Sequence, residues 1–179
     1  EVDQNVVRGQ YTSGYVEGQE VQGYRSAAGV NPGSRTETYA AARFFIDNWR
    51  WQGVPFYLRS GKCLPKKLTE IAIVFKPAPV DLFRKGADPM SPNVLTLRAD
   101  PEEGITLRLA SKIPGMTTRT RWVNMDFDYS SAFGVPSPTA YQRLLHDCMI
   151  GDATLYSRAD AIEYAWQATQ PILDRWAES

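Results

Sequence analysis

The residues best suited to chemistry lie in a basic turn, which we define as residues 56–67, FYLRSGKCLPKK. Lys62, Lys66 and Lys67 supply three ammonium groups that can act as point charges toward phosphate oxygens. Gly61 has no Cβ atom, so the backbone beside it can approach an anion closely. The turn therefore suits a phosphorylated ligand, although on spacing alone a solvated basic hairpin end is the simpler interpretation.

Few other side chains are suited to chemistry. The chain has two cysteines, Cys63 and Cys148, and one histidine, His146, and these residues lack the spacing of metal ligands. We expect both cysteines to be reduced thiols in an intracellular compartment. Cys63 follows Lys62, whose charge can lower the pKa of a thiol, but no oriented base accompanies it. His146 is interpreted as a surface or packed imidazole beside Asp147, so we predict no catalytic residue and no metal site in this chain.

The composition is that of a soluble globular domain. A chain of 179 residues, 43% of them hydrophobic, is long enough for one domain with a sizeable core. Twenty basic residues balance twenty acidic residues, so no net charge attracts nucleic acid or an anionic membrane. No apolar run approaches the length of a membrane span, and the first residues lack a secretory signal. These features predict a soluble, cytoplasmic chain that binds neither nucleic acid nor membranes.

The elements that precede the basic turn can be predicted from periodicity. Residues 1–33 are rich in glycine, which indicates loops with one strand near residues 6–11. Ser34 to Glu37 have the form of a capping box. The apolar residues that follow repeat at helical spacing, namely Tyr39, Ala42, Phe45, Ile46 and Trp49. The sequence therefore predicts a first helix that begins at Ser34 and places this apolar stripe in the core.

After the basic turn the periodicity is that of strands. Residues 69–75 alternate, residues 94–99 and 105–110 indicate a hairpin, and residues 119–129 continue the pattern. The Pro- and Gly-containing segment 80–92 indicates an exposed loop.

Two helices are expected near the end of the chain. One begins at Ser137 and ends near Met149, and the other begins near Arg158 and is disturbed at Pro171. Adjacent strands without intervening helices favour antiparallel pairing. We therefore predict an α+β fold in which residues 1–179 form one domain, with helices flanking a large, mainly antiparallel, mixed β-sheet.

The motifs of this chain resemble those of a known family. Residues 58–67 of the basic turn are similar to LR-x-GK-x-L-x-x-K of the glucose-6-phosphate dehydrogenase C-terminal domain. Six further motifs follow the family order at plausible spacing: Arg8–Tyr11, Gly23-Tyr24, Trp51–Phe56, Lys112–Met116, Ala140–Leu144 and Arg158–Trp166. Six ordered matches make coincidence improbable, so the chain is identified as a member of that family.

The resemblance implies that this chain is one domain of a longer enzyme, whose other parts carry out catalysis. The sequence contains no G-x-G-x-x-G fingerprint opening a βαβ unit. In the family the coenzyme domain and the histidine that acts as general base both precede this domain. We therefore expect an isolated C-terminal domain that is inactive by itself. Two alternatives stay open: a free-standing module that binds a sugar phosphate without oxidising it, and a pure oligomerisation domain.

The resemblance also implies a substrate and a cofactor. The intact enzyme would oxidise glucose 6-phosphate to 6-phosphogluconolactone in the oxidative pentose phosphate pathway, with NADP⁺ as the hydride acceptor. Family counterparts of Lys62 and Lys67 bind the substrate, whereas Lys66 matches no family role. The NADP cofactor would be bound mainly by the absent N-terminal domain. Because the substrate of the family is a sugar phosphate, the resemblance favours a phosphate site in the basic turn over a solvated hairpin end.

Two further family features concern assembly and a second nucleotide. The family sheet forms the subunit interface, which implies a homodimer that can pair into a tetramer. Animal members bind a structural NADP⁺ on this domain, and Arg59, Arg98 and Arg158 match basic residues of that site. However, Leu68 and Ala72 replace cations there, and Thr106 replaces an aromatic residue. We therefore expect no tightly bound structural nucleotide.

Overall fold

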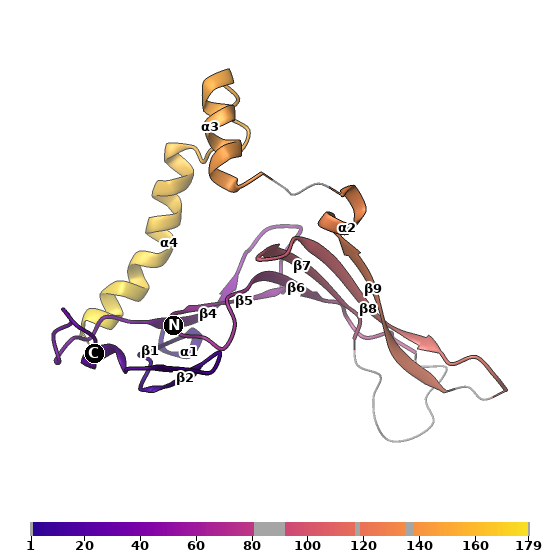
Figure 1. The fold of residues 1–179 in the computed structure, drawn as a ribbon, viewed down its shortest axis with the longest axis horizontal. Helices are drawn as coiled ribbons and strands as arrows, with labels where there is room; N and C mark the ends of the chain where they lie inside the picture. The colour runs from indigo at the N-terminus through magenta and orange to yellow at the C-terminus, as the bar shows by residue number, and fades with distance from the viewer. Residues whose placement is uncertain (1, 81–91, 117–118, 135–137, 179) are drawn as a thin grey trace. The chain divides into compact units, whose positions relative to one another are not determined.

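The computed structural model of the chain describes residues 2–80, 92–116, 119–134 and 138–178 (Figure 1). The chain divides into two compact units. Unit 1 contains residues 1–66 and 144–179, and unit 2 contains residues 67–143. Each unit has its own antiparallel sheet, so the two are described separately.

Unit 1 is built on a three-stranded sheet in the order β1-β4-β5. Its strands are β1 (Val6–Gly9), β4 (Tyr39–Phe45) and β5 (Pro55–Gly61). A short hairpin of β2 (Gly14–Val16) and β3 (Gln19–Val21) and a 3-10 turn, η1 (Tyr24–Ser26), connect β1 to β4. Tyr39 pairs with Gly9 on one side and Gly61 on the other, so β4 is the central strand. This pairing places the basic turn at the end of β5.

The predicted helix beginning at Ser34 is wrong, because Tyr39, Ala42 and Phe45 of its apolar stripe lie in strand β4, and the last two residues of the stripe follow the strand outside any helix. Every residue of β4 pairs with β5, and four of them also pair with β1. Hydrogen bonds to two neighbouring strands outweigh the helical preference of a segment rich in alanine. The capping box is also absent: the Glu37 side chain accepts a 2.7 Å hydrogen bond from Arg8 instead.

Helices complete unit 1. They are α1 (Val2–Asn5), the part of α3 (Ala140–Ile150) from residue 144, and α4 (Ala159–Glu178). The prediction that Pro171 disturbs α4 is wrong, since α4 continues through it. Near its end, Arg175 donates three hydrogen bonds of 2.8–3.0 Å to the Asp3 carboxylate. These hydrogen bonds hold the pKa of Asp3 below its ordinary value and join α4 to α1.

Unit 2 is built on a four-stranded antiparallel sheet in the order β6-β7-β8-β9. The strands are β6 (Thr69–Val74), β7 (Val94–Asp100), β8 (Gly104–Lys112) and β9 (Thr120–Asp128). A single-turn helix, α2 (Tyr129–Phe133), follows β9 and begins where the Asp128 carboxylate accepts the Ser131 amide. The four predicted strands of this region are confirmed. The predicted loop at residues 80–92 and the predicted helix start at Ser137 lie largely or wholly outside the described residues.

One face of the unit 2 sheet is apolar, and we call it the apolar face. Residues that pair directly across neighbouring strands lie on the same face. The register therefore brings together one apolar set: Ile71, Ile73, Leu95, Leu97, Ile105, Leu107, Leu109, Val123, Met125 and Phe127. Ile71 and Met125 are 62% and 63% exposed, so the outer strands of this face are open to solvent.

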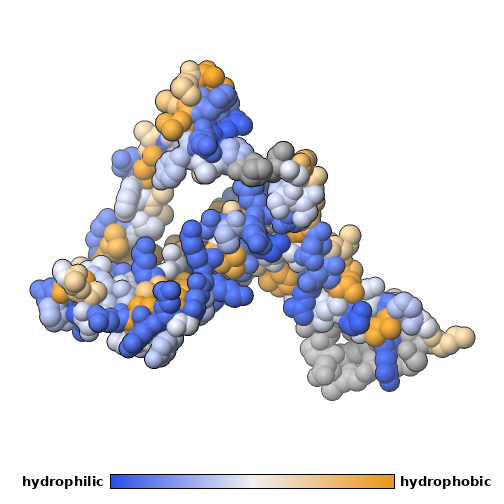
Figure 2. Space-filling view, in the orientation of Figure 1, coloured by the Kyte–Doolittle hydropathy of each residue, from blue (hydrophilic) through white to orange (hydrophobic). Residues whose placement is uncertain are grey.

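Uncovered apolar surface is a property of both units (Figure 2). No hydrophobic side chain among the described residues is buried. The α+β class with mainly antiparallel sheets is confirmed, and among the described residues the strands form three sheets rather than the expected single large one.

Candidate phosphate-binding turn

The basic turn begins at the last residue of β5. Gly61 pairs with Tyr39, and a Cβ atom on Gly61 would lie 2.8 Å from Cδ2 of the Tyr39 ring. That distance is shorter than side chains tolerate, so the structure gives Gly61 a packing reason in addition to the predicted approach of an anion. The next residue, Lys62, donates its backbone N–H to the Thr38 carbonyl at 2.8 Å. Lys62 is therefore anchored through its backbone while its side chain is exposed.

Thr38 makes two more hydrogen bonds in the same place. Its N–H donates to the Gly9 carbonyl at 2.9 Å, and its hydroxyl accepts the Tyr11 N–H at 2.9 Å. The Gly9–Tyr11 motif, residue 38 and the start of the basic turn are thus joined around one threonine. Sequence reasoning missed Thr38, because the false helix prediction included it and no motif singled it out.

Cys63 continues the turn in a left-handed backbone conformation, with φ of 54°. This conformation is uncommon for residues other than glycine. Burial raises the pKa of the Tyr11 hydroxyl, and the neighbouring Cys63 thiol raises it further. Cys63 is a free, exposed thiol, as is Cys148. Tyr11 and Cys63 therefore belong to the same neighbourhood as Lys62.

The two lysines predicted to bind substrate fall in different units. Lys62 belongs to unit 1, and Lys67 is the first residue of unit 2. The Lys67 ammonium lies 3.4 Å from an oxygen of Asp100, and its side chain is 86% exposed. An ion pair this exposed is worth about 0–1 kcal/mol, so it leaves Lys67 available to another anion. Lys66 is also exposed.

His146 lies on α3 with 61% of its side chain exposed. Its Nδ1 is 3.5 Å from Oδ1 of Asp147, whose own side chain is fully buried. A contact this long is a weak orienting interaction. His146 is thus a surface imidazole beside a buried carboxylate, one of the two predicted arrangements.

The three arginines considered for a structural nucleotide have local roles. Arg59 lies on β5 and pairs with Ala41. The Arg98 guanidinium lies so close to Gly104 that a Cβ atom there would be 2.9 Å from one of its nitrogens, and its Nε is buried without a partner. Arg158 donates two hydrogen bonds to Asp160, at 2.7 and 3.1 Å.

Thr106, which stands where the nucleotide site of animal members has an aromatic residue, also has a local contact. Its hydroxyl donates a 2.6 Å hydrogen bond to Asp126. The expectation that no structural nucleotide binds at Arg59, Arg98 and Arg158 stays a prediction.

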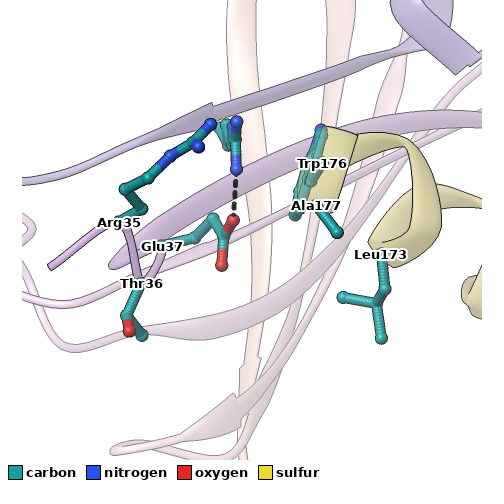
Figure 3. A pocket seen from close by; sticks show the side chains of 7 residues that line it. Arg35, Thr36, Glu37, Leu173, Trp176 and Ala177 are labelled. Atoms are coloured by element: carbon teal, nitrogen blue, oxygen red, sulfur yellow. Dashed lines mark hydrogen bonds and ion pairs between the residues drawn. The ribbon is translucent and has the colours of Figure 1, made fainter. Parts of the chain in front are cut away.

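A separate cavity of about 310 Å³ lies within unit 1, between the segment at residues 35–37 and the end of α4 (Figure 3). Arg8 donates a hydrogen bond to Glu37, and its guanidinium carbon lies 5.6 Å from the centroid of the Trp176 ring. Burial disfavours the charged form of Glu37, but Arg8 and the nearby Arg35 hold its pKa below the ordinary value. The cavity is thus walled by an ion pair and an indole that stabilise unit 1.

In the described parts of the chain, no group of three or more His, Cys, Asp or Glu side chains is arranged to hold a metal ion. None of the described helices combines the length and the hydrophobicity that crossing a membrane requires.

Comparison with known proteins decides the family. The family model described as glucose-6-phosphate dehydrogenase, C-terminal domain, matches residues 1–179. The chain belongs to this family. Among curated relatives, glucose-6-phosphate 1-dehydrogenase of Aggregatibacter actinomycetemcomitans is 48% identical over 178 residues, covering 99% of this chain and 35% of the relative. The same enzyme of Chlamydia muridarum is 44% identical over 179 residues, covering 98% of this chain and 35% of the relative.

Solved structures of the family have the same fold. The glucose-6-phosphate 1-dehydrogenase of Mycobacterium avium matches with a TM-score of 0.76 and 38% identity over 96% of this chain and 34% of its own. A glucose-6-phosphate dehydrogenase in complex with its substrate glucose 6-phosphate matches with a TM-score of 0.82 and 31% identity, over 97% of this chain and 35% of its own. The glucose-6-phosphate dehydrogenase domain described here thus spans about a third of the length of its relatives.

Proposed function

We propose that this domain is the C-terminal part of a cytoplasmic, NADP-dependent glucose-6-phosphate dehydrogenase, in which the basic turn binds the phosphate of the substrate. The match of the C-terminal domain family to residues 1–179 carries the proposal, and the hydrogen bond that anchors the Lys62 backbone to Thr38 supports it. The enzyme would act in the oxidative pentose phosphate pathway. Lys62 and Lys67 are the residues of this chain assigned to the substrate.

The reaction removes a hydride from the anomeric carbon of glucose 6-phosphate and a proton from its hydroxyl group, which leaves 6-phosphogluconolactone. NADP⁺, when bound, supplies the hydride acceptor. This chain's residues contribute by positioning: the lysine ammonium groups hold the phosphate dianion, so the sugar presents its reacting carbon in one orientation. Fixing a substrate in this way lowers a barrier by as much as about 7–11 kcal/mol in ideal systems.

Two other functions are distinguished by simple observations. A free-standing sugar-phosphate module would retain Lys62 and Lys67 but would be encoded by a short gene. An oligomerisation domain would associate normally after both lysines were replaced and would not bind glucose 6-phosphate. The sequence encoded upstream of residue 1 would separate the first of these from the proposed enzyme.

We expect residues 1–179, expressed alone, to show no glucose 6-phosphate oxidation. Hydride transfer needs a nicotinamide pocket and a proton acceptor, and the sequence has no dinucleotide fingerprint. Its one histidine lies on the surface of α3. NADPH absorbance, followed with both substrates present and the full-length enzyme as the positive control, tests this expectation. Turnover by the domain above the protein-free background would contradict it.

We also expect the domain to self-associate as a two-fold homodimer through the unit 2 sheet. The apolar face carries ten apolar side chains and is open at Ile71 and Met125. Exposed apolar patches of this kind favour association with a matching surface. Sedimentation at micromolar concentration should give about twice the 20.1 kDa of the chain.

Neighbouring residues of β9 provide a matched control for this association. Met125 lies on the apolar face, and Asn124 lies on the opposite face. Met125→Lys should shift the domain toward monomer, whereas Asn124→Lys, which adds the same charge, should not. A wild-type domain that sediments as a well-behaved monomer would refute association through this sheet.

A further inference from the structure

Thr38 is the residue that connects the start of the basic turn to the rest of unit 1. Its carbonyl accepts the Lys62 N–H at 2.8 Å, its N–H donates to Gly9 at 2.9 Å, and its hydroxyl accepts the Tyr11 N–H at 2.9 Å. Two of these hydrogen bonds use the backbone and survive any side-chain change. Only the bond to Tyr11 depends on the residue being a threonine or a serine.

The position of Lys62 depends on this connection. Strand pairing between β4 and β5 ends at the pair of Tyr39 and Gly61, so Lys62 lies just beyond the ladder. Its bond to the Thr38 carbonyl extends the register by one residue. A lysine side chain is a flexible four-carbon stem, so the place of its ammonium group is set largely by how firmly its backbone is held.

The surroundings make the Thr38 hydroxyl costly to remove. Tyr11 and Thr38 are both half-buried, and the Tyr11 N–H would lose its acceptor. A buried donor left without a partner is relieved by a shift of the backbone or by entry of water. Either change would move the 9–11 segment away from residue 38, and the carbonyl that holds Lys62 would become less fixed.

We propose that Thr38 is a positioning residue for Lys62, with its hydroxyl group fixing the backbone that presents the lysine to the substrate phosphate. This role rests on the proposed function of the basic turn. Thr38 itself contacts no substrate in this scheme. Its effect should therefore appear selectively in the binding of the phosphorylated substrate.

The test compares four variants of the full-length enzyme. Thr38→Val removes the hydroxyl and keeps the shape, and Thr38→Ser keeps the hydroxyl. Thr36→Val is the matched control, because it removes the same hydroxyl from an exposed residue two positions away, where the hydroxyl accepts a 3.2 Å hydrogen bond from Ser34. Lys62→Ala tests the proposed function itself. For each variant, KM for glucose 6-phosphate, KM for NADP⁺, kcat and the thermal midpoint are measured.

We expect Thr38→Val to raise KM for glucose 6-phosphate about 5-fold, which corresponds to the loss of about one hydrogen bond. KM for NADP⁺ should stay unchanged, and Thr38→Ser and Thr36→Val should resemble the wild type. If Thr38→Val fails to fold, Thr38→Ala removes the same hydroxyl with less bulk and is compared in its place.

The outcomes separate the inference from the function on which it rests. If Lys62→Ala raises KM for glucose 6-phosphate but Thr38→Val behaves like Thr36→Val, the positioning role is wrong and the function stands. If Thr38→Val lowers only the thermal midpoint, or raises both KM values alike, Thr38 is merely structural. If Lys62→Ala leaves KM for glucose 6-phosphate unchanged, the proposed phosphate site is wrong.

Discussion

Replacing Lys62 with alanine in the full-length enzyme should raise KM for glucose 6-phosphate by about 10- to 150-fold, while KM for NADP⁺ changes little. A hydrogen bond to a charged group is worth about 1.5–3 kcal/mol, and that range converts to this change in affinity. The expected selectivity arises because only one substrate presents its phosphate to the basic turn. Lys67→Ala should act in the same direction, since its exposed ion pair with Asp100 costs little to exchange for a phosphate.

Lys66 supplies the control for this prediction. It lies in the same turn, is exposed like Lys62, and loses the same charge when it is replaced by alanine. Lys66→Ala should therefore leave KM for glucose 6-phosphate within about two-fold of the wild type, as expected for an exposed charge without a specific contact. Equal effects of Lys62→Ala and Lys66→Ala would indicate that the summed positive charge of the turn attracts the substrate, without a specific contact from Lys62. Equal effects on both substrates would count against a phosphate site.

Replacing Gly104 with alanine should destabilise the protein by about 2 kcal/mol or more, as overpacked sites commonly do. A Cβ atom at this buried residue would lie 2.7 Å from the Phe127 carbonyl oxygen, which belongs to the neighbouring strand β9. It would also lie 2.9 Å from the Arg98 guanidinium. A side chain can move aside, but the carbonyl can move only if the pairing of β8 with β9 changes.

Gly14 is the matched control for Gly104. It also lies in a strand, β2, but a Cβ atom there would meet nothing within 4 Å. Gly14→Ala should be neutral or should stabilise by about 0.4–1 kcal/mol, because alanine restricts the unfolded chain. Urea denaturation of both variants, with wild type alongside, measures the difference. A Gly104→Ala variant as stable as Gly14→Ala would show that the sheet adapts without cost.

Unit 2 was predictable because its strands are both amphipathic and consecutive. Residues 69–75, 94–99, 105–110 and 119–129 each alternate, and neighbours in sequence are neighbours in the sheet. The alternation identifies each strand, and antiparallel pairing was predicted because no helix was expected between them. The helix containing His146 was predicted from a start signal at Ser137 rather than from alternation.

Unit 1 could not be predicted to the same degree. Strand β4 contains Ala40, Ala41 and Ala42, which favour a helix. It forms a strand because residues 6–9 pair with it on one side and residues 55–61 on the other. Propensity contains no information about such partners. Pro171 was misjudged for the opposite reason, because a local rule about proline was outweighed by the remainder of α4.

The residues of the candidate site were also only partly predictable from the sequence. The lysines of the basic turn could be found from residue type and motif, since charge is visible in a sequence. Thr38 could not, because its role depends on hydrogen bonds to residues far away in the chain. Sequence reasoning therefore finds the group that meets a ligand more readily than the group that supports it.

The contact between Gly61 and Tyr39 has a consequence for how this turn can change over time. The ring occupies the space that any side chain at residue 61 would need. A side chain at residue 61 therefore requires the ring to move or to be replaced, and the Thr38 carbonyl, which would lie 3.3 Å from the Cβ atom, must also give way, so the order of substitutions matters. Tyr39 thus limits which residues can replace Gly61 in the basic turn, although it lies in a different strand and carries no charge.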